Sequence, residues 1–104
     1  MIVSVSEEGR YAPVLICDIC EQRITDAGLA GVVSRTDQAG GVELNEVLYA
    51  HKGRCLDAAE EKLGGYRVTG WRELSDHLID LLYNCGLTVE KLVELKKLSD
   101  KNSF

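Results

Sequence analysis

Four side chains that can bind a metal ion stand in two short groups. Cys17 and Cys20 form a Cys-x2-Cys pair, and His51 and Cys55 form a His-x3-Cys pair further along the chain. Thiolate and imidazole groups both bind Zn²⁺, a d10 ion that accepts the tetrahedral geometry imposed by four such ligands. Two residues between the cysteines allow a tight turn that directs both sulfurs at one ion. The sequence therefore predicts a zinc site built from these four residues.

The second pair falls where a strand is expected to give way to a helix. His51 ends a β-prone segment, Gly53 permits a sharp change of direction, and Cys55 falls in the first turn of the helix. The partial positive charge at a helix N-terminus favours a thiolate there. Three thiolates leave the zinc site with a formal charge of −1, which nearby cations are expected to neutralise. These cations are Arg23, Lys52 and Arg54.

The first half of the chain is predicted to be rich in β-structure. Short β-prone segments cover residues 1–5, 11–16, 29–34 and 42–50, with turn signals at Glu8-Gly9 and Gly40-Gly41. Strong helix formers then occupy residues 54–63, and Gly64-Gly65 ends that pattern.

The second half is predicted to be helical. Residues 66–70 are interpreted as a linker, and Thr88 is a suitable N-cap for a last helix. Between them, apolar residues recur at helical spacing. They are Trp71, Leu74, Leu78, Leu81, Leu82 and Cys85. We therefore expect an α+β chain, with a zinc-binding module at residues 1–65 and a two-helix antiparallel hairpin at residues 66–104.

The order of these elements resembles the treble-clef zinc fingers, to which LIM-like modules are related. The resemblance covers residues 15–63 and rests on Cys17, Cys20, His51 and Cys55. It implies a zinc knuckle, a β-hairpin and a helix whose first turn supplies the last ligand, as in small bacterial proteins with such a finger. Three residues separate the second pair where treble clefs usually have two, and Glu21 follows the knuckle where glycine is common.

Other interpretations of the cysteines and aromatic residues stay open. Cys17 and Cys20 could serve thiol redox chemistry, or be buried as inert small residues, but neither explains the second pair. Cys85 is expected in the helical core, and it is the rival of His51 as fourth ligand. His77 is expected on a solvated helix face, and Trp71 is expected to anchor the helical hairpin.

Composition limits the classes of function. The chain has 104 residues, 45% of them apolar and 6% aromatic, which predicts one small domain with a modest core. Its 12 basic and 17 acidic residues oppose phosphate contacts, so a nucleic-acid footprint is not expected. The longest apolar run covers only residues 12–17, which predicts no membrane span, and we expect a cytoplasmic, reducing setting.

The predicted function is that of a structural-zinc adaptor that is not an enzyme. Four protein ligands leave no open coordination position for catalysis, and known catalytic zinc or phosphate-loop motifs do not occur. A protein partner or self-association is expected through the apolar stripes, namely Trp71, Leu74, Leu78, Leu81, Leu92 and Leu95. The alternative is a nucleic-acid-binding regulator that uses a helix-turn-helix-like segment at residues 81–98, and a thiol redox protein is the third option.

Overall fold

In the part of the chain that the structure describes, two small antiparallel sheets and three α-helices make up the fold, in agreement with the α+β prediction. The computed structural model describes residues 1–36 and 46–101, with side chains as far as residue 98. The predicted turn at Gly40-Gly41, and the first residues of the strand predicted at 42–50, lie outside the described residues.

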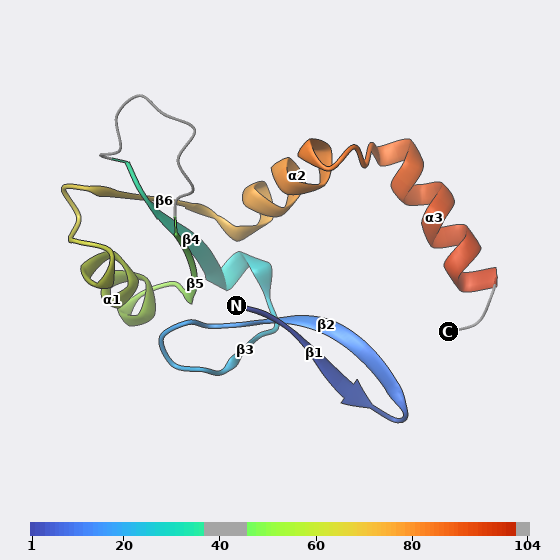
Figure 1. The fold of residues 1–104 in the computed structure, drawn as a ribbon, viewed down its shortest axis with the longest axis horizontal. Helices are drawn as coiled ribbons and strands as arrows, with labels where there is room; N and C mark the ends of the chain where they lie inside the picture. Colours follow the sequence, from blue (N-terminus) through green and yellow to red (C-terminus); the bar gives the residue numbers. More distant parts are fainter. Residues whose placement is uncertain (37–45, 102–104) are drawn as a thin grey trace.

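The first sheet has the order β1-β2-β3. Strands β1 (Ile2–Glu7) and β2 (Arg10–Ile16) form a hairpin, and the short β3 (Arg23–Ile24) pairs with the end of β2. Glu8 and Gly9 form the hairpin turn with positive φ angles of 50° and 77°. The pairing of β1 with β2 confirms the two predicted strands and their turn. The hairpin projects away from the second sheet (Figure 1).

The second sheet has β4 (Ala30–Arg35) at its centre, between β5 (Val47–His51) and β6 (Thr69–Glu73). The first four residues of β4 are all buried, which means that both faces of this strand are covered. Helix α1 (Arg54–Lys62) packs against β4 and β5, while the start of α2 (Leu74–Asn84) packs against β4 and β6. A 3-10 turn, η1 (Ala27–Leu29), leads into β4.

Strand β6 corrects two predictions made from the sequence. The end of the expected linker and Trp71 form a strand, in which Trp71 pairs with Val33 of β4. A Cβ atom on Gly31 would lie 3.0 Å from the Trp71 ring, so the glycine makes room for the indole. Trp71 therefore packs on the sheet instead of anchoring a helical hairpin, and residues beyond 65 add a strand to the sheet that contains His51.

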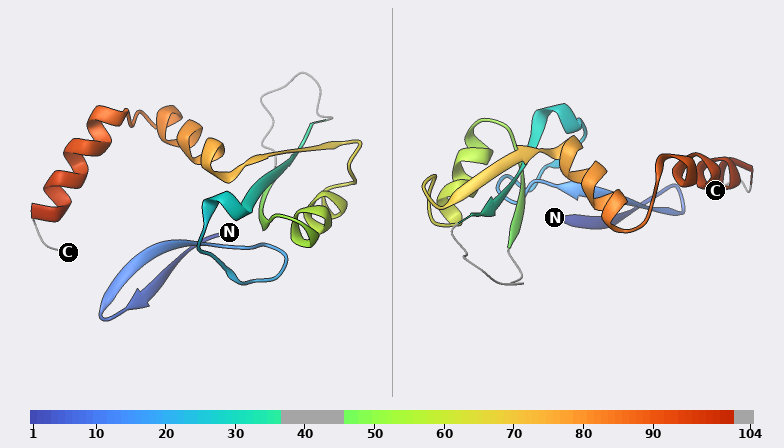
Figure 2. Two further views of the ribbon diagram at one scale, coloured as in Figure 1. Left: turned by 180° about the vertical axis from the view of Figure 1, so that it is seen from behind. Right: turned by 90° about the horizontal axis from the view of Figure 1, so that it is seen from above.

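Helices α2 and α3 (Val89–Lys101) do not form the predicted antiparallel hairpin. They diverge from the bend between them, and α3 runs away from the second sheet (Figures 1 and 2). The first part of the apolar stripe of α2 already packs on the body of the protein, because Leu74 is only 1% exposed and Leu78 packs against the core. The predicted cap of α3 is confirmed, since the Lys91 N–H donates to Thr88 Oγ1 at 3.2 Å.

The main core lies around β4, α1 and the start of α2. Leu74, Val33 and Cys17 are its largest fully buried side chains. Among the described residues, no helix has the length and apolar character needed to cross a membrane. One of the predicted metal ligands, Cys17, is thus part of the hydrophobic core.

Candidate metal centre

The first pair of predicted ligands lies on a tight turn between β2 and β3. Cys17 follows the last residue of β2, and its N–H donates to the carbonyl of Gln22 at 2.9 Å. The N–H of Glu21 donates back to the carbonyl of Cys17 at 3.0 Å. These two hydrogen bonds close the turn around Cys20, as expected for a zinc knuckle.

Glu21, which stands where a knuckle commonly has glycine, adopts a left-handed backbone conformation. Its φ of 61° lies in the left-handed region, which costs a residue with a Cβ about 1–2 kcal/mol. The knuckle is therefore built with some backbone strain at this position.

The second pair lies where β5 leads into α1, as predicted. His51 is the last residue of β5, and Cys55 is the second residue of α1. Gly53 makes the turn between them with a φ of 89°, and its carbonyl accepts from the N–H of Asp57 at 3.0 Å. This turn accommodates the three residues that separate His51 from Cys55, so that both residues can still face one ion.

Two hydrogen bonds connect the knuckle to β5. The Asp18 N–H donates to the Tyr49 carbonyl at 2.8 Å, and the Tyr49 N–H donates to Asp18 Oδ2 at 2.8 Å. Tyr49 stands two residues before His51 on the same strand, so this connection sets the distance between the two ligand pairs. The ligand pattern does not predict this role for Asp18, although an aspartate inside Cys-x2-Cys is a residue type that often bonds to nearby backbone.

The four ligand atoms of Cys17, Cys20, His51 and Cys55 all lie within 4.8 Å of one another. Cys20 Sγ and His51 Nδ1 are 3.4 Å apart. Bond lengths of about 2.3 Å to sulfur and 2.0–2.1 Å to nitrogen imply ligand-to-ligand distances of about 3.5–3.8 Å in a tetrahedron. The group therefore fits a zinc ion after small side-chain rotations.

Cys85 is not part of this group and does not compete with His51. It lies at the C-terminal end of α2 and is exposed, so the prediction that it is a core residue is wrong. The physical reason is the path of α3, which leaves the end of α2 uncovered (Figure 2).

The cysteines differ in their acidity before a metal binds. Burial raises the pKa of Cys17, but hydrogen bonds from the backbone of Cys20, His51 and Ile19 outweigh it and lower the pKa to about 6. Burial and the neighbouring sulfurs of Cys17 and Cys20 raise the pKa of Cys55 to about 11. The helix N-terminus alone thus does not make Cys55 a thiolate, and metal binding has to displace its proton.

Two of the three cations expected to neutralise the site are bound elsewhere. Arg23 pairs with Glu7 at 2.9 Å, and Lys52 pairs with Glu73 at 2.7 Å while its Nζ lies 5.9 Å from the centroid of the Trp71 ring. Arg54, the third cation, is exposed at the start of α1.

His77 is half-buried instead of solvated. Its ring makes an edge-on contact with Tyr49, with centroids 5.7 Å apart, and Nε2 lies 3.5 Å from the Tyr49 hydroxyl. Burial lowers the pKa of His77, and Arg72 lowers it further. The contact adds α2 to the structure that holds β5 in place.

No family model, curated protein or solved structure matches this chain.

We predict that Asp18→Ala weakens zinc binding, because the Tyr49 N–H loses its acceptor and the knuckle is less firmly attached to β5. The lost hydrogen bond to a charged group corresponds to about 1.5–3 kcal/mol. Competition with a chromophoric chelator measures the affinity. Asp18→Asn keeps an acceptor oxygen and should retain most of the affinity, whereas equal losses in both variants would contradict this role.

We also predict that Glu21→Gly stabilises the zinc-loaded protein by up to about 1 kcal/mol, because glycine adopts a positive φ without strain. The matched control is Gln22→Gly in the same turn, which has no positive φ to relieve and should lower stability. Urea unfolding measures both variants. A loss of stability in Glu21→Gly as large as that in Gln22→Gly would contradict the prediction.

Proposed function

We propose that the protein binds one Zn²⁺ through Cys17, Cys20, His51 and Cys55, and that the metal has a structural role in a protein-interaction module. The observation that carries this proposal is the convergence of four ligand atoms from two distant segments within 4.8 Å. A set of three thiols and one imidazole matches the Cys3His composition typical of structural zinc sites.

A structural role agrees with the place of the site in the fold. Cys17 is fully buried in the core, and the knuckle and β5 both contribute ligands, so a bound ion would join the first sheet to the second. Structural zinc in small peptides contributes about 10–16 kcal/mol near neutral pH, which compares with the 5–15 kcal/mol stability of a typical domain. A metal of this strength would compensate for a modest apolar core.

The order of elements supports a treble-clef-like arrangement. The knuckle is followed by the antiparallel pair β4 and β5, and then by α1 with Cys55 in its first turn. Glu21, where a knuckle commonly has glycine, has a positive φ of 61°, a conformation that glycine adopts readily. Strand β6 extends the pair to a three-stranded sheet.

An interaction role is supported by apolar side chains that the described part of the chain leaves exposed. Of the six residues expected to contact a partner, Leu74 is buried and Leu78 is partly buried in this protein's own core. The exposed apolar residues of β6, α2 and α3 are Trp71, Ile79, Leu81, Tyr83, Val89, Val93, Leu95 and Leu98. These side chains are available for contact with a protein, and the net charge of −5 favours a protein over a nucleic acid.

We predict that Cys17→Ser and Cys55→Ser each abolish stoichiometric zinc binding and fold poorly, because each removes a thiolate ligand. Cys85→Ser is the matched control and should keep one zinc per chain and the original thermal stability. Metal analysis under reducing conditions and thermal unfolding with and without a chelator measure these effects. A protein that is metal-free when purified under reducing conditions, and unaffected by the chelator, would refute the proposal.

A further inference from the structure

The three cysteines of the candidate site differ in how far solvent can reach them. Cys20, in the turn of the knuckle, is exposed, whereas Cys55 is half-buried and Cys17 is fully buried. Oxidation of a cysteine by a small molecule depends on access to its sulfur. An oxidant in solution therefore meets Cys20 before it meets either of the other two cysteines.

The two cysteines of the knuckle also differ in hydrogen bonding. The sulfur of Cys17 accepts hydrogen bonds from the backbone N–H groups of Ile19, Cys20 and His51. Donors of this kind withdraw electron density from a sulfur and make it a weaker nucleophile. Both burial and hydrogen bonding thus protect Cys17, and the more reactive sulfur of the knuckle is that of Cys20.

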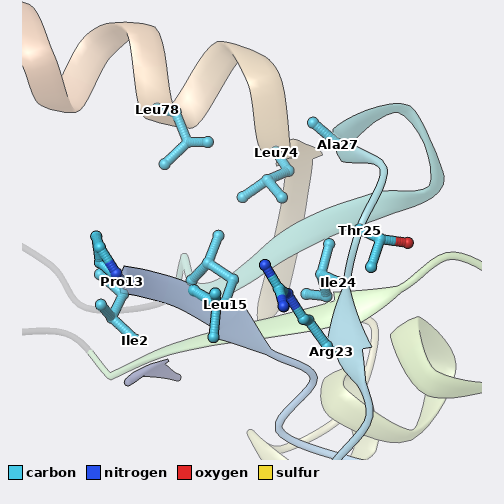
Figure 3. A pocket seen from close by; sticks show the side chains of 10 residues that line it. Ile2, Pro13, Leu15, Arg23, Ile24, Thr25, Ala27, Leu74 and Leu78 are labelled. Atoms are coloured by element: carbon cyan, nitrogen blue, oxygen red, sulfur yellow. The ribbon is translucent and has the colours of Figure 1, made fainter. Parts of the chain in front are cut away.

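The charge of the site favours attack by its sulfurs on an oxidant. Three thiolates on one Zn²⁺ leave a formal charge of −1, and the thiolate is the nucleophilic form of cysteine. Two of the cations expected to offset this charge pair with carboxylates instead, Arg23 with Glu7 and Lys52 with Glu73. The side chain of Arg23 lines the groove between the first sheet and α2 (Figure 3). These two ion pairs therefore do not neutralise the sulfurs.

Cys17 lies where it can react with an oxidised Cys20. The two residues are three apart in one turn, which is closed by the 3.0 Å hydrogen bond from the Glu21 N–H to the Cys17 carbonyl. A disulfide needs Cα atoms within about 7 Å of each other, which a Cys-x2-Cys turn provides. Side-chain rotations inside this turn are enough to join the two sulfurs, whereas a bond from Cys20 to Cys55 has to draw the knuckle and α1 together.

We propose that Cys20 is a modification site for peroxides, and that its oxidation leads to a disulfide with Cys17 and to release of the zinc ion. This inference rests on the proposed zinc site and adds a means of regulating it. Formation of the disulfide removes two of the four ligands. His51 and Cys55 remain, and two ligands are too few for a structural zinc site.

The two steps balance with hydrogen peroxide as the oxidant. The Cys20 thiolate attacks one peroxide oxygen, so that an S–O bond forms, the O–O bond breaks and the first water leaves. The Cys17 thiolate then attacks the Cys20 sulfur, so that the S–S bond forms, the S–O bond breaks and the second water leaves. The two sulfurs together lose two electrons to the peroxide, and two protons are taken up from solvent.

The test treats the full-length, zinc-loaded protein with hydrogen peroxide after the reductant has been removed. A chromophoric chelator follows zinc release against a sample without peroxide, and peptide mass spectrometry after alkylation of the free thiols identifies the disulfide. The wild-type protein should release one zinc per chain and contain the Cys17–Cys20 disulfide. Dithiothreitol and added zinc should then restore one zinc per chain, because a disulfide is reversible.

Cys20→His and Cys55→His form a matched pair, because each replaces one thiolate by an imidazole that can still bind zinc. Cys20→His removes the point of attack and should release zinc at least about tenfold more slowly than the wild-type protein. Cys55→His should still form the Cys17–Cys20 disulfide and lose its zinc. Cys85→Ser removes an exposed cysteine outside the site and should not change the release.

The disulfide of the wild-type protein decides the matter even if a histidine variant binds zinc poorly. Wild-type protein that keeps its zinc in peroxide, or that loses it with a disulfide to Cys55 or with no disulfide, would overturn this inference alone. Protein that holds no zinc before peroxide is added would overturn the proposed function, and this inference with it.

Discussion

The pair of hydrogen bonds between Asp18 and Tyr49 is the constraint on which the rest of the candidate site depends. The two bonds attach the knuckle of the first sheet to the central part of β5, two residues before His51. Apart from this connection, the first sheet meets the second through core packing, in which Cys17 and Ile24 lie with residues of β4 and β5. With this connection, ligand atoms from both sheets lie within 4.8 Å of one another before any metal is bound.

The site and the hydrophobic core support each other. Cys17 is buried among the core residues, and the half-buried His77 of α2 packs against Tyr49 on the strand that carries His51. Strand β6 pairs with β4 and leads directly into Leu74, the most buried residue of α2. A metal that holds the knuckle to β5 would thus stabilise the same group of elements that the core stabilises.

The features that depend on local sequence could be predicted, and those that depend on long-range pairing could not. Residues close together in the chain predict the two ligand pairs, Cys17 with Cys20 and His51 with Cys55. They also predict the strand before the knuckle and the helix after Gly53. The position of Trp71 in the sequence fits a helical apolar stripe as well as it fits a strand. Only the pairing of Trp71 with Val33 of β4 decides between helix and strand. The exposure of Cys85 and the burial of His77 depend likewise on how α2 and α3 lie in space, which apolar periodicity does not specify.

The central claim is that three sulfurs and one imidazole nitrogen hold a single zinc ion. X-ray absorption at the zinc edge of the purified protein tests this most directly, because sulfur and nitrogen ligands differ in distance. We expect four ligands per zinc, three sulfurs at about 2.3 Å and one nitrogen at about 2.0–2.1 Å. A first shell of four sulfurs, a shell of oxygen and nitrogen atoms alone, or protein without zinc would contradict it.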